Sequence, residues 1–127
     1  MNYIVTSLLS LFFLISSLMS IPYDKLEEAF SKGKASEIME MGANKVLISI
    51  EGKEGVYSQS QGTQILNVFF KDHPPKSFSF DFKGKEESTS TFAIGEYHSK
   101  SVFRISVKFK KSKTAHQIES ISILSKS

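Results

Sequence analysis

An aspartate and two tyrosines are the side chains of this sequence best suited to acid–base chemistry. A carboxylate base beside a tyrosine hydroxyl in an apolar cavity can move a proton next to a carbonyl group, and Asp81, Tyr97 and Tyr57 could supply these groups. Asp81, however, alternates with the phenylalanines of residues 78–82. In a strand, this places the carboxylate on the face opposite the rings, where water solvates it. We therefore expect no catalytic residue and keep a small isomerase- or hydratase-like enzyme as the alternative.

The spacing of the histidines and the lack of cysteine predict neither a metal site nor a cofactor. His73 precedes a proline, His98 lies at a predicted turn, and His116 begins a predicted strand; their spacing matches no metal-binding motif. The chain contains no cysteine. This excludes thiolate metal sites, disulfide bonds and a lipid-modified cysteine. The fold must therefore be held together by core packing.

Basic side chains gather at the carboxyl-terminal end of the chain. Residues 100–127 contain seven basic residues and one acidic residue, whereas the rest of the chain contains nine basic and twelve acidic ones. Arg104 and Lys108 fall on one face of a predicted strand, and more lysines crown the turn that follows. This face could attract an anionic glycan, lipid head groups or an acidic protein. The simpler alternative is that the lysines protect sheet edges from aggregation.

The first twenty residues are typical of a secretory signal peptide. Residues 1–23 carry no charged side chain, and the serines Ser16, Ser17 and Ser20 offer small residues for a cleavage site. The alternative is an uncleaved membrane anchor, but the 16 apolar-biased residues 4–19 fall short of the roughly 20 that span a bilayer. We expect a signal peptide at 1–20 and a single domain at 21–127. The protein would be exported, periplasmic or extracellular, with no transmembrane segment after cleavage.

A capped helix with a double-proline stop forms the centre of the predicted domain. Ser58 and Gln61 match a capping box, in which each side chain bonds to the backbone N–H of the other residue. Apolar residues then recur at intervals of three and four, which predicts one broad buried stripe. Prolines at 74 and 75 end the helix, because proline lacks an N–H and disfavours helical geometry in the residue before it. The helix should run from about residue 59 to residue 72. The apolar stripe consists of Ile65, Leu66, Phe69 and Phe70.

The remaining segments predict two short helices and several strands. Helices of about ten and six residues are expected from Asp24, with a capping box to Glu27, and from Ser36. A period of two marks a hairpin at residues 46–57 and four long strands afterwards. Ile118 is out of phase with the isoleucines that follow it, which predicts a β-bulge near residues 119–120. We expect an α+β fold in which a cone-shaped, curved antiparallel sheet wraps about three helices. The long strands are expected at residues 77–83, 89–97, 102–109 and 116–124.

Short runs of residues spread over positions 24–124 carry a family resemblance. They are Glu54-Gly55-Val56-Tyr57-Ser58, Gln64-Ile65-Leu66, Phe69-Phe70, Pro74-Pro75-Lys76-Ser77-Phe78, Phe92-Ala93-Ile94-Gly95 and Phe103-Arg104-Ile105. With these runs the chain resembles a small family of uncharacterised exported bacterial proteins in the nuclear transport factor 2-like, or cystatin-like, superfamily. The resemblance implies a cone-shaped sheet curled around helices and a secreted or periplasmic location. It implies no known activity, because a shared fold does not by itself carry function.

We therefore expect a non-catalytic binding domain rather than an enzyme. Its partner would be a small ligand, a peptide or an anionic molecule, held between sheet and helices or on the basic strand face. Nucleic acid is not expected, because no aromatic residues alternate with the basic ones as a stacking platform. Dimerisation through a sheet face is a third possibility. An interior filled by phenylalanines would count against the enzyme. The expected contact residues are Tyr97, Arg104 and Lys108, with Asp81 and Tyr57 as further candidates.

Overall fold

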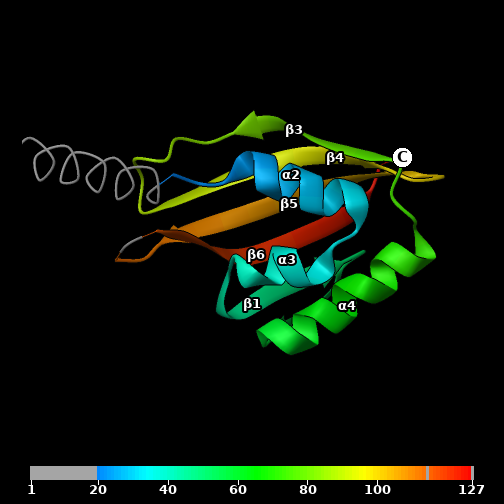
Figure 1. Cartoon of the computed structure of the whole chain (residues 1–127), viewed down its shortest axis with the longest axis horizontal. Coiled ribbons are helices and arrows are strands. Elements are labelled where there is room, and N and C mark those ends of the chain that lie inside the picture. The colour runs from blue at the N-terminus through cyan, green and yellow to red at the C-terminus, as the bar shows by residue number, and fades with distance from the viewer. Residues whose placement is uncertain (1–19, 114, 127) are drawn as a thin grey trace, which may run out of the picture.

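The computed structural model describes residues 20–113 and 115–126, so all of the predicted signal peptide except Ser20 lies outside the described residues. The described part of the chain forms three helices and six strands (Figure 1). The two short helices and the central helix have the predicted lengths and order. In chain order, the elements are α2 (Tyr23–Lys32), α3 (Ala35–Glu40), β1 (Gly42–Ile50), β2 (Lys53–Tyr57), α4 (Gln59–Asp72), β3 (Ser77–Lys83), β4 (Ser90–His98), β5 (Val102–Lys111) and β6 (His116–Ser125).

The six strands form one curved, open sheet in the order β2-β1-β6-β5-β4-β3. Helix α4 carries the chain from the edge strand β2 to the opposite edge strand β3. The antiparallel strands β3 to β6 then lead back across the sheet. Strand β6 therefore arrives beside β1 and pairs with it in parallel, a contact that the period-two pattern did not specify. The predicted α+β fold with a curved sheet and three helices is confirmed, and the parallel pair makes the sheet mixed.

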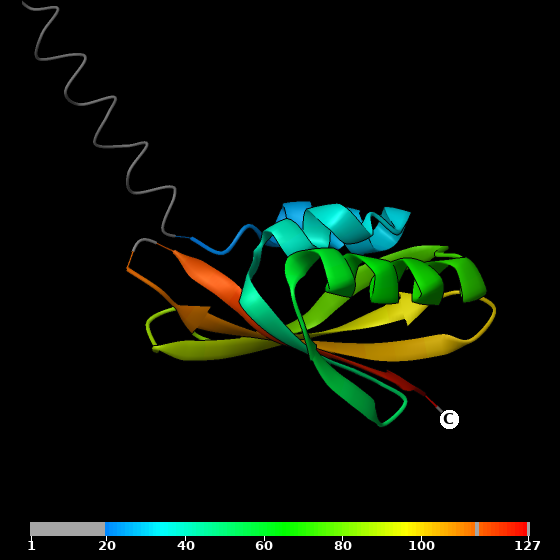
Figure 2. The same cartoon turned by 90° about the horizontal axis from the view of Figure 1, so that it is seen from below.

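All three helices cover the same face of the sheet, and the other face carries no helix in the described chain (Figure 2). Apolar side chains from the helices and from alternate strand positions meet between the two layers. The core therefore lies on one side of the sheet only. Its largest fully buried side chains include Tyr97, Phe30, Leu26, Ile38, Met39 and Ile48.

The central helix α4 is capped as the sequence predicts. The Ser58 Oγ accepts the Gln61 N–H at 3.3 Å, and the Gln61 side chain accepts the Ser58 N–H at 3.2 Å. Three of the four residues of the apolar stripe are buried, and Ile65 is partly buried. Gly62 also faces the core, where an added Cβ would lie 2.4 Å from the Met39 Cε. The glycine therefore allows α3 to approach α4 closely.

Helix α2 begins differently from the prediction. Its N-cap residue makes no side-chain cap bond, so the predicted capping box between Asp24 and Glu27 is wrong. The Glu27 carboxylate instead accepts the N–H of Phe80 at 2.8 Å, and the Ser31 hydroxyl donates to the carbonyl of Phe78 at 3.2 Å. Both backbone groups belong to the edge strand β3. Helix α2 therefore satisfies edge groups that could otherwise pair with another chain.

Bulges in β6 and β3 set which side chains face the core, and only the bulge in β6 was predicted. In β6, Ile118 pairs with Phe109 whereas Ser120 pairs with Lys108, so Glu119 is the extra residue. This confirms the predicted bulge near residues 119–120. After it, the isoleucines at positions 121 and 123 return to the core.

The second bulge lies in β3 and corrects one predicted face. Phe80 pairs with Gly95, but Phe82 pairs with Ile94, so Asp81 is the extra residue. Because side chains alternate along a strand, one extra residue turns Phe82 to the opposite face. Phe82 is 48% exposed there. The prediction that Phe82 shares a face with Phe80 is therefore wrong.

Candidate functional site

The sheet face turned away from the helices, here called the outer face, presents its side chains in rows that cross the strands. Ser49, Ser122 and Ser106 lie next to one another on β1, β6 and β5. Ile94 and Phe82 continue the same row on β4 and β3. Small hydroxyl-bearing side chains therefore occupy the middle of the outer face, and larger apolar ones lie toward the β3 edge.

A hollow of about 360 Å³ lies over these serines and is here called the outer hollow. The row beside the serines contains Phe92 and Lys108, which are direct cross-strand neighbours on β4 and β5. Serine side chains are much shorter than those of Phe92 and Lys108, so the surface is depressed over the serines, beside this row. The outward-facing side chains of the outer hollow are Ser90, Phe92, Ser106, Lys108, Ser120 and Ser122.

An exposed phenylalanine, Phe92, lines the outer hollow, and a second one, Phe82, packs against it. Phe92 is 47% exposed, and its ring centroid lies 5.2 Å from that of Phe82. The bulge at Asp81 creates this pair, because without it the Phe82 ring would face the core. A half-exposed aromatic pair offers a ligand a flat apolar surface. The outer hollow therefore has an apolar wall beside its hydroxyl floor.

Lys108 supplies the positive charge of the outer hollow. It is exposed, and its direct cross-strand partners are Phe92 and Ser120. Among the residues that the structure describes, no ion pair involves Lys108. Arg104 lies on the same face, which confirms the predicted basic strand face, but its cross-strand neighbour is Glu96. Lys108 is therefore the better placed of the two cations for an anionic ligand.

Glu96 holds a small charge network near Arg104. Its carboxylate accepts a hydrogen bond from the Lys126 Nζ at 2.6 Å and lies 2.9 Å from the His98 Nε2. The hydrogen bond from Lys126 is the main reason that the pKa of Glu96 is lowered. A hollow of about 350 Å³, partly lined by Arg104 and Lys126, lies beside it. This end of the outer face therefore carries both signs of charge.

Tyr97 lies inside the core, although it was expected to contact a ligand. Its side chain is fully buried, and its ring packs against those of Phe69, Phe70 and Phe103. Its hydroxyl donates to the backbone carbonyl of His73. Burial raises the pKa of Tyr97 far above its usual value. The Tyr97 hydroxyl is therefore a structural donor that ties the end of α4 to β4.

The other two candidates lie on opposite edges of the sheet. Asp81 is exposed at the bulge of β3, whereas Tyr57 is partly buried on β2. These strands are the first and last of the six-stranded sheet. The structure therefore brings Arg104 and Lys108 together on one face, but it does not gather Asp81, Tyr57 and Tyr97 into one cavity.

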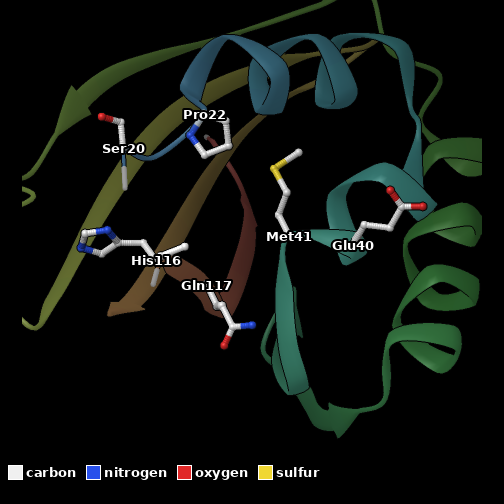
Figure 3. Close-up of a pocket in the computed structure, with 7 residues that line it drawn as sticks. Ser20, Pro22, Glu40, Met41, His116 and Gln117 are labelled. Carbon is white, nitrogen blue, oxygen red and sulfur yellow. The ribbon is translucent and has the colours of Figure 1, made fainter. Parts of the chain in front are cut away.

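A further hollow of about 330 Å³, here called the end hollow, lies where the described chain begins. Figure 3 shows Ser20 and Pro22 along one side of it, His116 and Gln117 along another, and Met41 opposite. Both ring nitrogens of His116 are shielded from solvent and lack a hydrogen-bond partner. No group of three metal-ligating side chains occurs in the described residues. No helix within residues 20–113 or 115–126 is long and apolar enough to cross a bilayer.

The sequence-based prediction of the site missed the serines and the aromatic pair. Ser106 and Ser122 alternate with buried valines and isoleucines, so the same period-two pattern could have placed them on the outer face. No comparable signal marks Phe82, because the bulge that exposes it is visible only in the pairing of β3 with β4. The sequence could therefore have predicted the serines of the outer hollow but not the aromatic pair beside it.

Known proteins identify the family and the fold but no activity. The crystal structure of a DUF4783 family protein from Bacteroides uniformis is 25% identical, covers 85% of this chain and 99% of its own, and has a TM-score of 0.78. An NTF2-like protein of unknown function from Shewanella baltica is 11% identical and covers 94% of this chain and 96% of its own, with a TM-score of 0.64. A Nostoc punctiforme domain of unknown function with a cystatin-like fold is 12% identical and covers 82% and 72%, with a TM-score of 0.63.

No curated protein matches the sequence. The structural neighbours show that the chain has the expected NTF2-like, or cystatin-like, fold. The model of the family described as "Domain of unknown function (DUF4783)" matches residues 23–123, which is most of the chain. This protein therefore belongs to the DUF4783 family.

Proposed function

We propose that this protein is an exported, non-catalytic binding domain that holds an acidic glycan on its outer face. The observation that carries the proposal is the outer hollow. Hydroxyls, a half-exposed aromatic ring and a lysine that forms no ion pair in the described residues converge there on one depression. Each of these groups matches a different part of a charged sugar.

A sugar ring has a flat apolar face and polar edges. The Phe92 ring offers a stacking surface for the face. Ser106 and Ser122 offer hydroxyls that both donate and accept hydrogen bonds at the edges. Lys108 supplies the opposite charge for a carboxylate or sulfate group on the glycan. The combination favours an acidic sugar over a purely apolar ligand.

The wider charge distribution supports an anionic partner. Seven of the eight charged residues in positions 100–127 are basic, as the sequence shows. Lys110 is exposed on β5 two residues beyond Lys108, and it pairs with Ser90 at the rim of the outer hollow. Clustered charge of one sign raises the local concentration of the opposite ion and speeds its association. A repeating acidic chain would therefore meet several lysines in succession.

The packed interior supports binding at the surface rather than catalysis inside the curved sheet. An isomerase- or hydratase-like enzyme of this shape needs an apolar cavity between sheet and helices, with a carboxylate pointing into it. The rings of Phe69, Phe70 and Phe78 are buried in that space. Asp81, the carboxylate considered for this role, is exposed on the edge strand. The geometry thus favours the binding domain.

Export is supported by the amino-terminal pattern. Residues 1–23 carry no charge and are followed by the domain, since the family model begins at residue 23. The absence of cysteine suits an oxidising compartment, where no thiol is at risk. Periplasmic or extracellular glycans would then be within reach of the outer face.

Retention on immobilised heparin, a sulfated glycan, tests this proposal. The double variant Lys108→Ala/Lys110→Ala should bind at least about tenfold more weakly than wild type at moderate salt. The control, Lys25→Ala/Lys71→Ala, removes the same net charge from exposed positions on α2 and α4. It should bind nearly as well as wild type. Phe92→Ser should weaken binding without changing its salt dependence, because it removes a stacking surface and no charge.

Two results would overturn the proposal. If both lysine pairs lowered retention equally, only net charge would matter and the outer hollow would have no special part. If the wild-type protein bound neither heparin nor polygalacturonate, a carboxylated glycan, at physiological salt, the acidic-glycan function would be excluded. Circular dichroism of each variant checks that the fold is intact.

A further inference from the structure

The chain enters the packed domain at Ile21, which is anchored at three points. Its side chain is 6% exposed and belongs to the core. Its carbonyl accepts the N–H of Tyr23 at 2.9 Å. Its backbone nitrogen donates to the Oε1 of Glu86 at 2.9 Å, although Glu86 lies 65 positions later in the chain. The Glu86 carboxylate therefore contacts the backbone nitrogen of the first core residue.

This nitrogen follows the last small residue of the predicted signal peptide. Ser20 is exposed and lines the end hollow, outside the core (Figure 3). A small residue of this kind is what a signal peptidase requires immediately before its cut. We propose that maturation cuts the chain between Ser20 and Ile21, and that the new Ile21 ammonium forms an ion pair with Glu86. This proposal rests on the proposed export, because the cut takes place during export.

The cleavage changes the chemistry of one atom. Water adds across the peptide bond between Ser20 and Ile21, so the released peptide ends in a carboxylate and Ile21 begins with an amine. That amine takes up a proton at neutral pH, because an α-amino group has a pKa of about 7.7–8.0. One neutral N–H donor facing Glu86 thus becomes a charged group with three donors. Charge-assisted hydrogen bonds are roughly twice as strong as neutral ones.

The Glu86 carboxylate offsets the unfavourable interaction between the Ile21 ammonium and the nearby N-terminus of α2. Helix α2 starts two residues later, at Tyr23, and the positive end of a helix disfavours a nearby ammonium group. Asp24, in the first turn of α2, offsets part of this cost. Glu86 comes from the turn between β3 and β4 and is the carboxylate in contact with the nitrogen. The ion pair would thus join the new chain end to that turn.

Other titratable groups lie near the proposed pair. Tyr23 has a raised pKa, mainly through burial and then through the charge of Glu86, and the Lys83 Nζ lies 4.9 Å from the centroid of its ring. Asp24 faces the same end of α2, and His116 lines the end hollow with Ser20. The contribution of the ion pair to stability should be present around pH 6–7, where carboxylates are ionised and an α-amino group is protonated, and it should be lost as pH rises through the pKa of the amine.

The first experiment locates the cut. The full chain is exported from a bacterial host, and the mass of the recovered protein is measured. The expected mass is that of residues 21–127. A mass that starts at Leu18, as cleavage after Ser17 would give, would overturn the proposed cut, and so would an unprocessed chain.

The second experiment tests the ion pair without relying on export. Residues 21–127 contain every residue of the described core, and they can be released from a fusion partner with Ile21 first. The pH titration of the Ile21 amine is followed by NMR in wild type, Glu86→Gln and the control Glu87→Gln, an exposed neighbour on the same turn. The amine should bind its proton about tenfold more tightly in wild type and in Glu87→Gln than in Glu86→Gln.

Acetylation of the Ile21 amine gives an independent measurement, because it removes the charge and leaves every side chain in place. It should lower the melting temperature of residues 21–127 by about 2–6 °C in wild type and by less in Glu86→Gln. Equal proton affinity in all three chains, or an equal effect of acetylation in wild type and Glu86→Gln, would refute the ion pair. Neither result bears on heparin retention, so failure of the glycan proposal is detected separately.

Discussion

Replacing Phe69 by alanine is the most direct test of the packing described here. The Phe69 side chain is 4% exposed, on the inner face of α4. Its ring centroid lies 5.7 Å from that of Phe70, 5.1 Å from the His73 ring, 5.3 Å from Tyr97 and 5.1 Å from Phe103. These rings belong to α4, its C-cap, β4 and β5. Phe69 therefore joins the helix layer to the sheet.

The structure sets the size of the expected loss. Truncation of a buried phenylalanine to alanine removes its transfer free energy and leaves a cavity, at a cost of about 3–5 kcal/mol. The rings around Phe69 are held by separate elements, so the cavity should collapse little, and the upper half of that range is expected. At about 4 °C per kcal/mol for a domain of this size, the melting temperature should fall by about 16–20 °C. Urea unfolding followed by circular dichroism measures the loss, and the m-value should stay unchanged.

The neighbouring residue supplies the control. Val68 lies on the same helix and is 59% exposed. Val68→Ala should change the free energy of unfolding by no more than about 0.5 kcal/mol, as is usual for a surface substitution. If Phe69→Ala and Val68→Ala agreed within about 1 kcal/mol, the packing of α4 against β4 and β5 would be refuted.

Three further substitutions test separate contacts by urea unfolding. Tyr97→Phe should cost about 0.5–1.5 kcal/mol, because the carbonyl of His73 loses its donor. Burial raises the pKa of Tyr97, so the neutral hydroxyl contributes to the free energy of unfolding below about pH 10, and this contribution is lost as the pH rises further. Tyr97→Phe should therefore lose less stability than wild type between pH 7 and pH 11. Gly95→Ala should cost about 1–3 kcal/mol, because its Cβ would lie 2.4 Å from the Phe78 Cζ; an unchanged urea midpoint would contradict the contact. Ser58→Ala should cost about 0.5–2 kcal/mol by removing the cap of α4, and a Ser58→Asp variant that keeps an acceptor should recover most of it.

The local elements were predictable because their causes lie within a few residues. The capping box at Ser58 and the prolines after His73 bound α4 without help from the rest of the chain. The bulge at Glu119 was visible because it shifts the spacing of isoleucines within β6 itself. The false capping box at Asp24 shows the limit of this reasoning. The Glu27 carboxylate instead accepts a hydrogen bond from the N–H of Phe80 in β3, a residue too far along the chain for a local pattern to include.

The candidate site was only half predictable for the same reason. Arg104 and Lys108 share a face because alternation along β5 requires it. The bulge at Asp81 appears only in the pairing of β3 with β4, and it turns Phe82 outward to meet Phe92. Tyr97 falls on the inner face of β4, and only its packing partners show that its hydroxyl is engaged.

The sequence alone determined the elements of this protein, the α+β class, and the basic face of β5, since all three follow from short-range spacing of apolar, capping and charged residues. Only the tertiary structure decided that β6 lies parallel to β1, that the outer face carries a hollow over its serines beside Phe92 and Lys108, and that Glu86 reaches the nitrogen of Ile21. These features join segments far apart in the chain. Which of them meet depends on how the curved sheet buries its apolar face beneath the helices, a property of the whole chain that no local window contains.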